Sequence, residues 1–107
     1  PEVKPYIFVQ EMPSFPGGEG ALLKFIVDNI HYPSDALENH IEGTVILQFV
    51  VTATGEVNRV VILRGADPLL DNEAVRVISI LPRWKPGKQD GNPVPVYFSV
   101  PVIFRIN

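Results

Sequence analysis

The chain has 107 residues, of which 46% are hydrophobic, and it carries a formal net charge of −3. This length suits one domain with a modest core, and the acidic balance argues against a nucleic-acid-binding protein. The sequence contains no cysteine, which excludes disulfides and cysteine-based zinc sites, and no apolar run reaches the roughly 20 residues of a membrane helix.

The first part of the chain is predicted to be an N-terminal arm, residues 1–19, that leads into a domain formed by residues 20–107. Residues 6–9 are apolar and are predicted to form a small strand or an extended segment, and residues 12–18 are rich in proline and glycine. Apolar residues then recur at helical spacing, which predicts a helix over residues 20–30.

Tyr32 and Pro33 are predicted to end this helix, because the residue before a proline is disfavoured in the α conformation. Ser34 is predicted to cap a second, short helix that runs to about Asn39. Two apolar residues four positions apart are predicted to form the buried face of this second helix: Leu37 and Ile41.

Residues 44–63 are predicted to form a β-hairpin with its turn at residues 53–56. Gly55 suits this turn because glycine readily adopts a positive φ. Alternate apolar residues of the first strand are predicted to share one buried face: Val45, Leu47, Phe49 and Val51.

A longer helix is predicted to begin with Asp67 at the N-cap and Pro68 at the first helical position. Further on, Trp84 is interpreted as a core residue flanked by solvated basic side chains rather than as a base-stacking residue. The apolar stripe of the helix is predicted to consist of Leu70, Ala74, Val77, Ile78 and Leu81.

The last apolar run, residues 93–106, is predicted to be a β-strand at the edge of the sheet. Every second residue from Val94 to Ile106 is apolar, so one continuous face should be buried. Pro95 and Pro101 have the other parity and remove backbone donors from one side of the strand. Such an edge is either blunted against aggregation or reserved for an incoming peptide strand. The residues that would still offer backbone hydrogen bonds there are Tyr97, Ser99, Ile103 and Arg105.

Together these elements predict an α+β fold of two layers, in which a three-stranded antiparallel sheet packs on helices. The long helix is expected to return the third strand beside the first. His31 and His40 lack carboxylates at metal-ligand spacing, and the acidic residues near Asp67 are explained by the start of a helix. We therefore expect no enzyme activity, no metal site and no cofactor.

Several short motifs, each weak alone, occur in an order and at a spacing typical of one protein family. They include Tyr32-Pro33, Thr54-Gly55-Glu56-Val57, Trp84-Lys85-Pro86-Gly87 and a closing run at residues 102–107. In this order they resemble the C-terminal domain of TonB, the energy transducer of Gram-negative bacteria. The lead-in at residues 12–18 resembles the version common in Bacteroidetes, and the resemblance covers nearly the whole chain.

This resemblance implies a periplasmic domain whose full-length protein is anchored in the inner membrane and couples the proton motive force to uptake through ExbB and ExbD. The chain begins without methionine, so we interpret it as a piece of such a protein. The implied partner is the TonB box of outer-membrane TonB-dependent receptors, added as a strand to the last strand; this favours a reserved edge over a blunted one. No cofactor is implied.

The predicted partner-binding residues follow from the edge argument and the resemblance together. They are Asn29, Tyr32, Pro33, Tyr97, Ser99, Val100, Pro101, Val102, Ile103, Phe104, Arg105 and Ile106. Asn29 stands where well-studied members of the family have a glutamine.

Three alternatives keep the same fold. The domain could be the periplasmic sensing module of a BlaR-type membrane metallopeptidase, or a structural module that binds peptidoglycan. An open sheet edge could also pair with its own copy in a strand-exchanged homodimer. A small enzyme is the remaining hypothesis, and no assembled site supports it.

Overall fold

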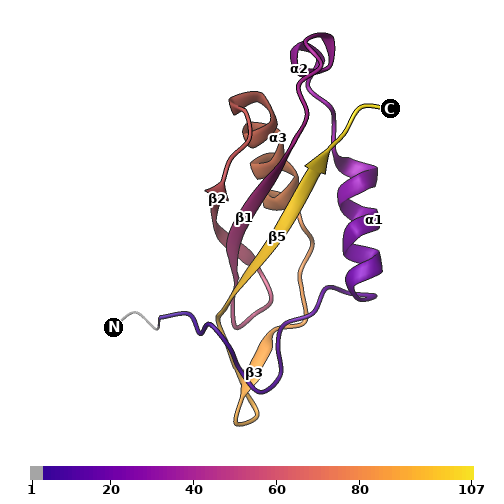
Figure 1. Ribbon diagram of the computed structural model, residues 1–107. Coiled ribbons are helices and arrows are strands. Elements are labelled where there is room, and N and C mark those ends of the chain that lie inside the picture. Colours follow the sequence, from indigo (N-terminus) through magenta and orange to yellow (C-terminus); the bar gives the residue numbers. More distant parts are fainter. Residues whose placement is uncertain (1–3) are drawn as a thin grey trace.

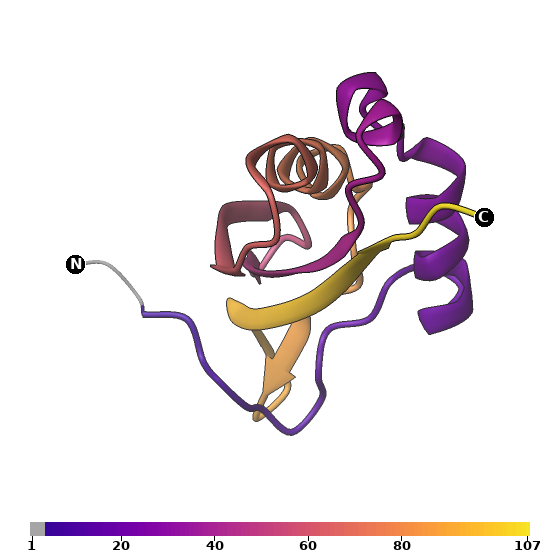
Figure 2. The same cartoon turned by 45° about the horizontal axis from the view of Figure 1, so that its top comes forward.

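The computed structural model describes residues 4–107, and residues 1–3 of the predicted arm lie outside this range (Figure 1). An antiparallel sheet has the strand order β2-β1-β5, and β3 and β4 form a separate hairpin. Figure 2 shows α2 and α3 on one side of the sheet, and Figure 1 shows the β3 hairpin at the end of the sheet where β5 begins. The predicted α+β fold is confirmed. The elements are α1 (Glu19–Asn29), α2 (Ser34–Glu38), β1 (Gly43–Val51), β2 (Val57–Arg64), α3 (Pro68–Ser79), β3 (Gly87–Gln89), β4 (Asn92–Val94) and β5 (Val96–Phe104).

The central strand, β1, provides one side of the core. Its four predicted inward residues are fully buried. So are the four residues of the predicted apolar stripe that lie in α3, namely Leu70, Ala74, Val77 and Ile78, whereas Leu81 follows the helix and is 9% exposed. Helix α3 begins as predicted, because the Asp67 carboxylate accepts a hydrogen bond from the Leu69 N–H at 2.9 Å. Trp84 is also a core residue, with its ring centroid 5.0 Å from that of Phe98.

The turn between β1 and β2 requires glycine at position 55. Gly55 has a φ of 87°, and its carbonyl accepts a hydrogen bond from the Trp84 N–H at 2.7 Å. A Cβ atom at this position would lie 2.0 Å from the Trp84 carbonyl oxygen. The turn and the segment after α3 can therefore approach each other only where no side chain intervenes.

The prediction for the second helix was wrong in two details. Pro33, not Ser34, occupies the N-cap position of α2, and Ser34 is its first helical residue. Leu37 is 46% exposed, whereas Ala36 is fully buried. The helix has only five residues, so it is too short to present a stripe of residues four apart, and one small side chain fits beneath it.

The predicted last strand is interrupted near its start. Residues 92–94 belong to β4, and β5 begins at Val96, after Pro95 breaks the ladder. The β3–β4 hairpin was missed by the sequence analysis. Its turn contains Asp90 and Gly91, both with positive φ (53° and 79°), and Asp-Gly is a strong signal for a tight hairpin turn.

Candidate functional site

Strand β5 is an edge strand, as the two prolines predicted, and its backbone orientation can be read from one contact. The Tyr97 N–H donates to the Tyr6 carbonyl at 2.9 Å, and the Pro95 carbonyl accepts from the Tyr6 N–H at 2.8 Å. Tyr6 lies outside the three-stranded sheet, so the odd-numbered residues of β5 direct their backbone groups away from β1. Pro101 is also odd-numbered, so the N–H that it lacks would have pointed away from β1. The hydrogen bonds between β1 and β5 are therefore complete despite this proline.

The stretch beyond Tyr97 leaves this edge open. Within residues 4–107, no hydrogen bond from outside the sheet reaches the backbone of Ser99 or Ile103. Both residues have exposed side chains and the outward parity. Residues 99–103 therefore present two N–H donors, at Ser99 and Ile103, separated by Pro101, which presents only a carbonyl.

An apolar groove follows the same edge, because α1 lies alongside β5 (Figure 1). One hollow, about 230 Å³, is lined by Leu22 and Ile26 of α1 and by residues 98–101. A second, about 150 Å³, is lined by Val27 of α1 and residues 101–103. We call these hollows, with the open backbone of residues 99–103, the edge groove.

The walls of the edge groove expose large apolar side chains. Leu23 and Val27, one helical turn apart on α1, are 60% and 70% exposed, and Ile103 of β5 is 59% exposed. Apolar residues gathered in this way on a domain surface mark an interaction site more often than single exposed side chains do. The groove can therefore accept an extended chain by backbone pairing on one side and apolar contact on the other.

The other edge of the sheet, β2, is less suitable for pairing. Its register with β1 shifts between Ile46 and Leu47 and again between Gln48 and Val50. Arg59 within β2 has a φ of 52°, outside the extended region. Bulges of this kind twist a strand and discourage a further strand from pairing, so the regular open edge is that of β5.

The predicted partner-binding residues of β5 have two different positions. Val100, Val102 and Phe104 are buried, and by parity their backbone groups face β1. These three residues hold β5 in the sheet and in the core, and their backbone groups are not available to a partner strand. The remaining predicted residues of this region are exposed or half-buried: Tyr97, Ser99, Pro101, Ile103, Arg105 and Ile106.

The other predicted residues lie near the C-terminal end of β5. Tyr32 packs edge to face on Phe104, with ring centroids 5.7 Å apart, and its hydroxyl donates to the Ile41 carbonyl. Burial raises the pKa of this hydroxyl, and the negative charge of Glu42 adds to the effect. Asn29 turns its amide back to the Phe25 carbonyl at 2.8 Å, within α1. These residues shape the end of the groove and are not aligned along its open backbone.

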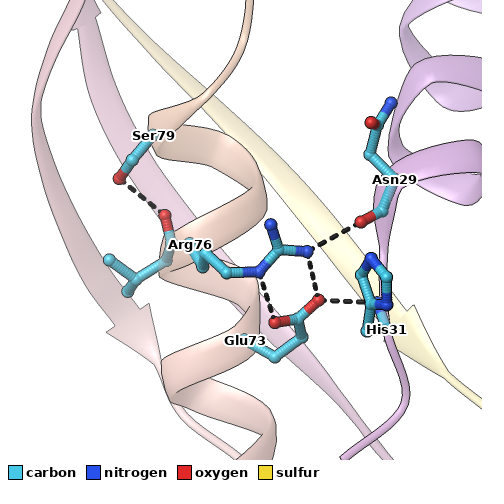
Figure 3. A network of polar contacts seen from close by, with 6 residues as sticks. Asn29, His31, Glu73, Arg76 and Ser79 are labelled. Carbon is cyan, nitrogen blue, oxygen red and sulfur yellow. Dashed lines mark hydrogen bonds and ion pairs between the residues drawn. The ribbon is translucent and has the colours of Figure 1, made fainter.

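A polar network fixes the C-terminal end of α1 to α3 (Figure 3). The Arg76 guanidinium donates to the Asn29 carbonyl and to the Glu73 carboxylate, both at 2.7 Å. Glu73 also accepts the His31 N–H at 2.6 Å, and its side chain is only 10% exposed. The hydrogen bonds from Arg76, and secondarily that from His31, lower the pKa of Glu73. The network thus sets the position of one wall of the groove.

Acidification is expected to loosen this wall. Because folding lowers the pKa of Glu73, its contribution to stability is complete above its usual pKa of about 4.5 and is lost as the pH falls through the lower folded value. Replacing Glu73 with Gln should cost about 1 kcal/mol at pH 7 and progressively less below pH 4.5. Urea unfolding of both proteins at pH 7, 4.5 and 3 measures the difference between their free energies of unfolding, which should shrink as the pH falls. A difference that stays constant over this range would show that the charge of Glu73 does not stabilise the fold.

Sequence reasoning missed the α1 wall of the groove, although a signal was present. Residues 22–30 contain more apolar side chains than one helical stripe can bury, and Leu23 and Val27 are the surplus. No cluster of three or more His, Cys, Asp or Glu side chains able to hold a metal occurs within residues 4–107. Over the same residues, no helix is both long and apolar enough to cross a membrane.

Comparison with known proteins gives one family and a consistent fold. The family model described as "Gram-negative bacterial TonB protein C-terminal" matches residues 28–106. A solution structure of the Helicobacter pylori TonB-CTD is similar with a TM-score of 0.62 and 20% identity, over 79% of this chain and 77% of that one. The Pseudomonas aeruginosa TonB CTD gives a TM-score of 0.60 and 25% identity, over 74% and 80%. No curated protein matches.

Proposed function

Because this chain belongs to the family of C-terminal domains of Gram-negative bacterial TonB proteins, we propose that it binds the TonB box of outer-membrane receptors by strand addition to β5. Family membership makes it a domain of a TonB-like energy transducer, placed in the periplasm, where it interacts with outer-membrane receptors. The observation that carries the finer proposal is the open backbone of residues 99–103 beside the apolar wall of α1.

The backbone of an added strand would complete the hydrogen bonding of this edge. The Ser99 and Ile103 N–H groups and the three outward carbonyls of Ser99, Pro101 and Ile103 offer about five hydrogen bonds, each worth roughly 1 kcal/mol net. After the cost of ordering the segment, this suits an affinity near micromolar. Such an affinity lets the contact form, transmit a pull and release.

The side chains of an added strand would explain the two hollows. Successive residues on one face of a strand lie about 7 Å apart, and every second side chain of the partner would point toward α1. Two apolar partner residues, two positions apart, would then lie against Leu23 and Val27. A partner segment with alternate apolar residues and no charge on that face fits this surface.

Coupling to the inner membrane completes the proposed function. ExbB and ExbD would act through regions that precede this domain in the full-length protein, and the proton motive force would be delivered to the receptor as a pull on the bound strand. The domain itself would need no cofactor for this role, because it transmits force through a non-covalent contact.

The proposal is tested with box peptides from receptors of the same organism, labelled and titrated with the domain by fluorescence anisotropy. We expect dissociation constants near micromolar. Strand addition uses N–H groups of one parity only, so N-methylation at alternate peptide positions should abolish binding for one parity and spare it for the other. Equal sensitivity at both parities, or no binding of any box peptide, would rule out strand addition.

A further inference from the structure

A short segment around Tyr6, here called the tip of the arm, already occupies the beginning of the edge of β5. Tyr6 forms a parallel bridge with Val96, using both of its backbone groups: its N–H donates to Pro95 at 2.8 Å, and its carbonyl accepts from Tyr97 at 2.9 Å. Any strand added along β5 would use the same two groups at this place, the Pro95 carbonyl and the Tyr97 N–H. The Tyr97 N–H points to the same side of β5 as the open donors at Ser99 and Ile103. It differs from them because it already donates a hydrogen bond to the Tyr6 carbonyl.

The arm behind this tip is firmly attached to another part of the domain. Val9 is 2% exposed, and Glu11 exchanges two backbone hydrogen bonds with Lys88, at 3.1 and 2.8 Å. Ser14 does the same with Lys85, at 3.0 and 2.9 Å. Tyr6 is therefore tethered three residues from a buried anchor, which keeps its concentration near the edge high.

The tip itself is held weakly. Ile7 and Phe8 are 82% and 78% exposed, and Tyr6 is 38% exposed. Between Tyr6 and Val9 the chain therefore buries little apolar surface against the domain. A segment with few buried contacts and two backbone hydrogen bonds can leave the edge without disturbing the core.

We propose that Tyr6 is an internal competitor for the partner edge, which a receptor segment must displace in order to pair along the whole of β5. This inference rests on the proposed function. A short segment that pairs only with residues 99–103 can bind beside the arm, whereas a longer one that reaches Tyr97 requires the same N–H that Tyr6 occupies. Displacement of the arm thus makes binding depend on the length of the partner segment.

A proline scan of the tip tests the competition in the full chain. Tyr6→Pro removes the N–H that donates to Pro95, whereas Ile7→Pro, its matched control, alters a residue of the opposite parity. We expect Tyr6→Pro to speed exchange of the Tyr97 amide and to tighten the binding of a long box peptide about tenfold. A short peptide, limited to the length of residues 99–103, should bind both variants and the unmodified chain equally.

The outcomes separate this inference from the proposed function. If the long peptide binds the unmodified chain and Tyr6→Pro with the same affinity, the arm is no competitor, while the proposed function stands. If Tyr97 exchanges as fast as Ser99 in the unmodified chain, the arm does not hold the edge in solution and the inference is overturned. If no box peptide binds any of the three proteins, the proposed function fails and the competition fails with it.

Discussion

Replacing Ile103 with proline is expected to weaken binding of a receptor box peptide by at least about tenfold while the domain stays folded. Ile103 is 59% exposed and has the parity whose N–H points away from β1, so the sheet loses nothing when this donor is removed. The added strand loses one of two remaining donors on the open edge, and the proline ring also obstructs its approach. Peptide anisotropy and circular dichroism of the variant measure the two effects.

Val102→Pro is the matched control, because it places the same ring one residue earlier. Val102 is 1% exposed and is paired with Val45 in β1, toward which its N–H is directed. This variant should lose a ladder hydrogen bond and unfold at clearly lower urea concentration. If Ile103→Pro unfolds the domain as readily as Val102→Pro, the assignment of the open edge is wrong.

Replacing Phe104 with alanine is expected to lower the free energy of unfolding by about 3–5 kcal/mol. Phe104 is 3% exposed and packs against the ring of Tyr32, so its removal leaves a cavity at the end of the core. For a domain whose total stability is about 5–15 kcal/mol, this is a large fraction. Urea unfolding followed by Trp84 fluorescence measures the loss, since Trp84 lies in the same core.

The neighbouring substitution Ile103→Ala provides the comparison. An exposed side chain on the same strand should change the free energy of unfolding by no more than about 0.5 kcal/mol. Similar losses for both variants would contradict the alternation of buried and exposed residues along β5. If only Phe104→Ala loses stability, Ile103→Ala is a folded variant that lacks one apolar side chain of the edge groove. Its affinity for a box peptide then measures the contribution of that side chain to binding.

The fold could be predicted well where a pattern is local and periodic. Three features depend on residues close in sequence: the alternation in β1, the capped start of α3 at Asp67 and Pro68, and the same parity of Pro95, just before β5, and Pro101 within it. Their signals are therefore complete within one segment, and the structure agrees with them. The edge position of β5 is the most informative of these, because Pro95 and Pro101 each remove an N–H donor that a central strand would need on that side.

The candidate site could be predicted only in part, because it depends on contacts between distant segments. The pairing of Tyr6 with β5 joins residues about 90 positions apart, and no local pattern encodes it. The apolar wall of α1 becomes a groove only once α1 lies beside β5. Arg76 and Glu73 likewise hold the end of α1 through residues that look like ordinary helix-surface charges in the sequence.

The most direct test of the account follows backbone amide NMR shifts of the isotope-labelled domain as a receptor box peptide is added. We expect the largest shifts at residues 97–103, with smaller ones at Leu23 and Val27 across the groove. The second edge of the sheet, β2, is an internal control and should stay unchanged. Shifts concentrated in β2, or spread evenly over the domain without a maximum at β5, would contradict strand addition at the proposed edge.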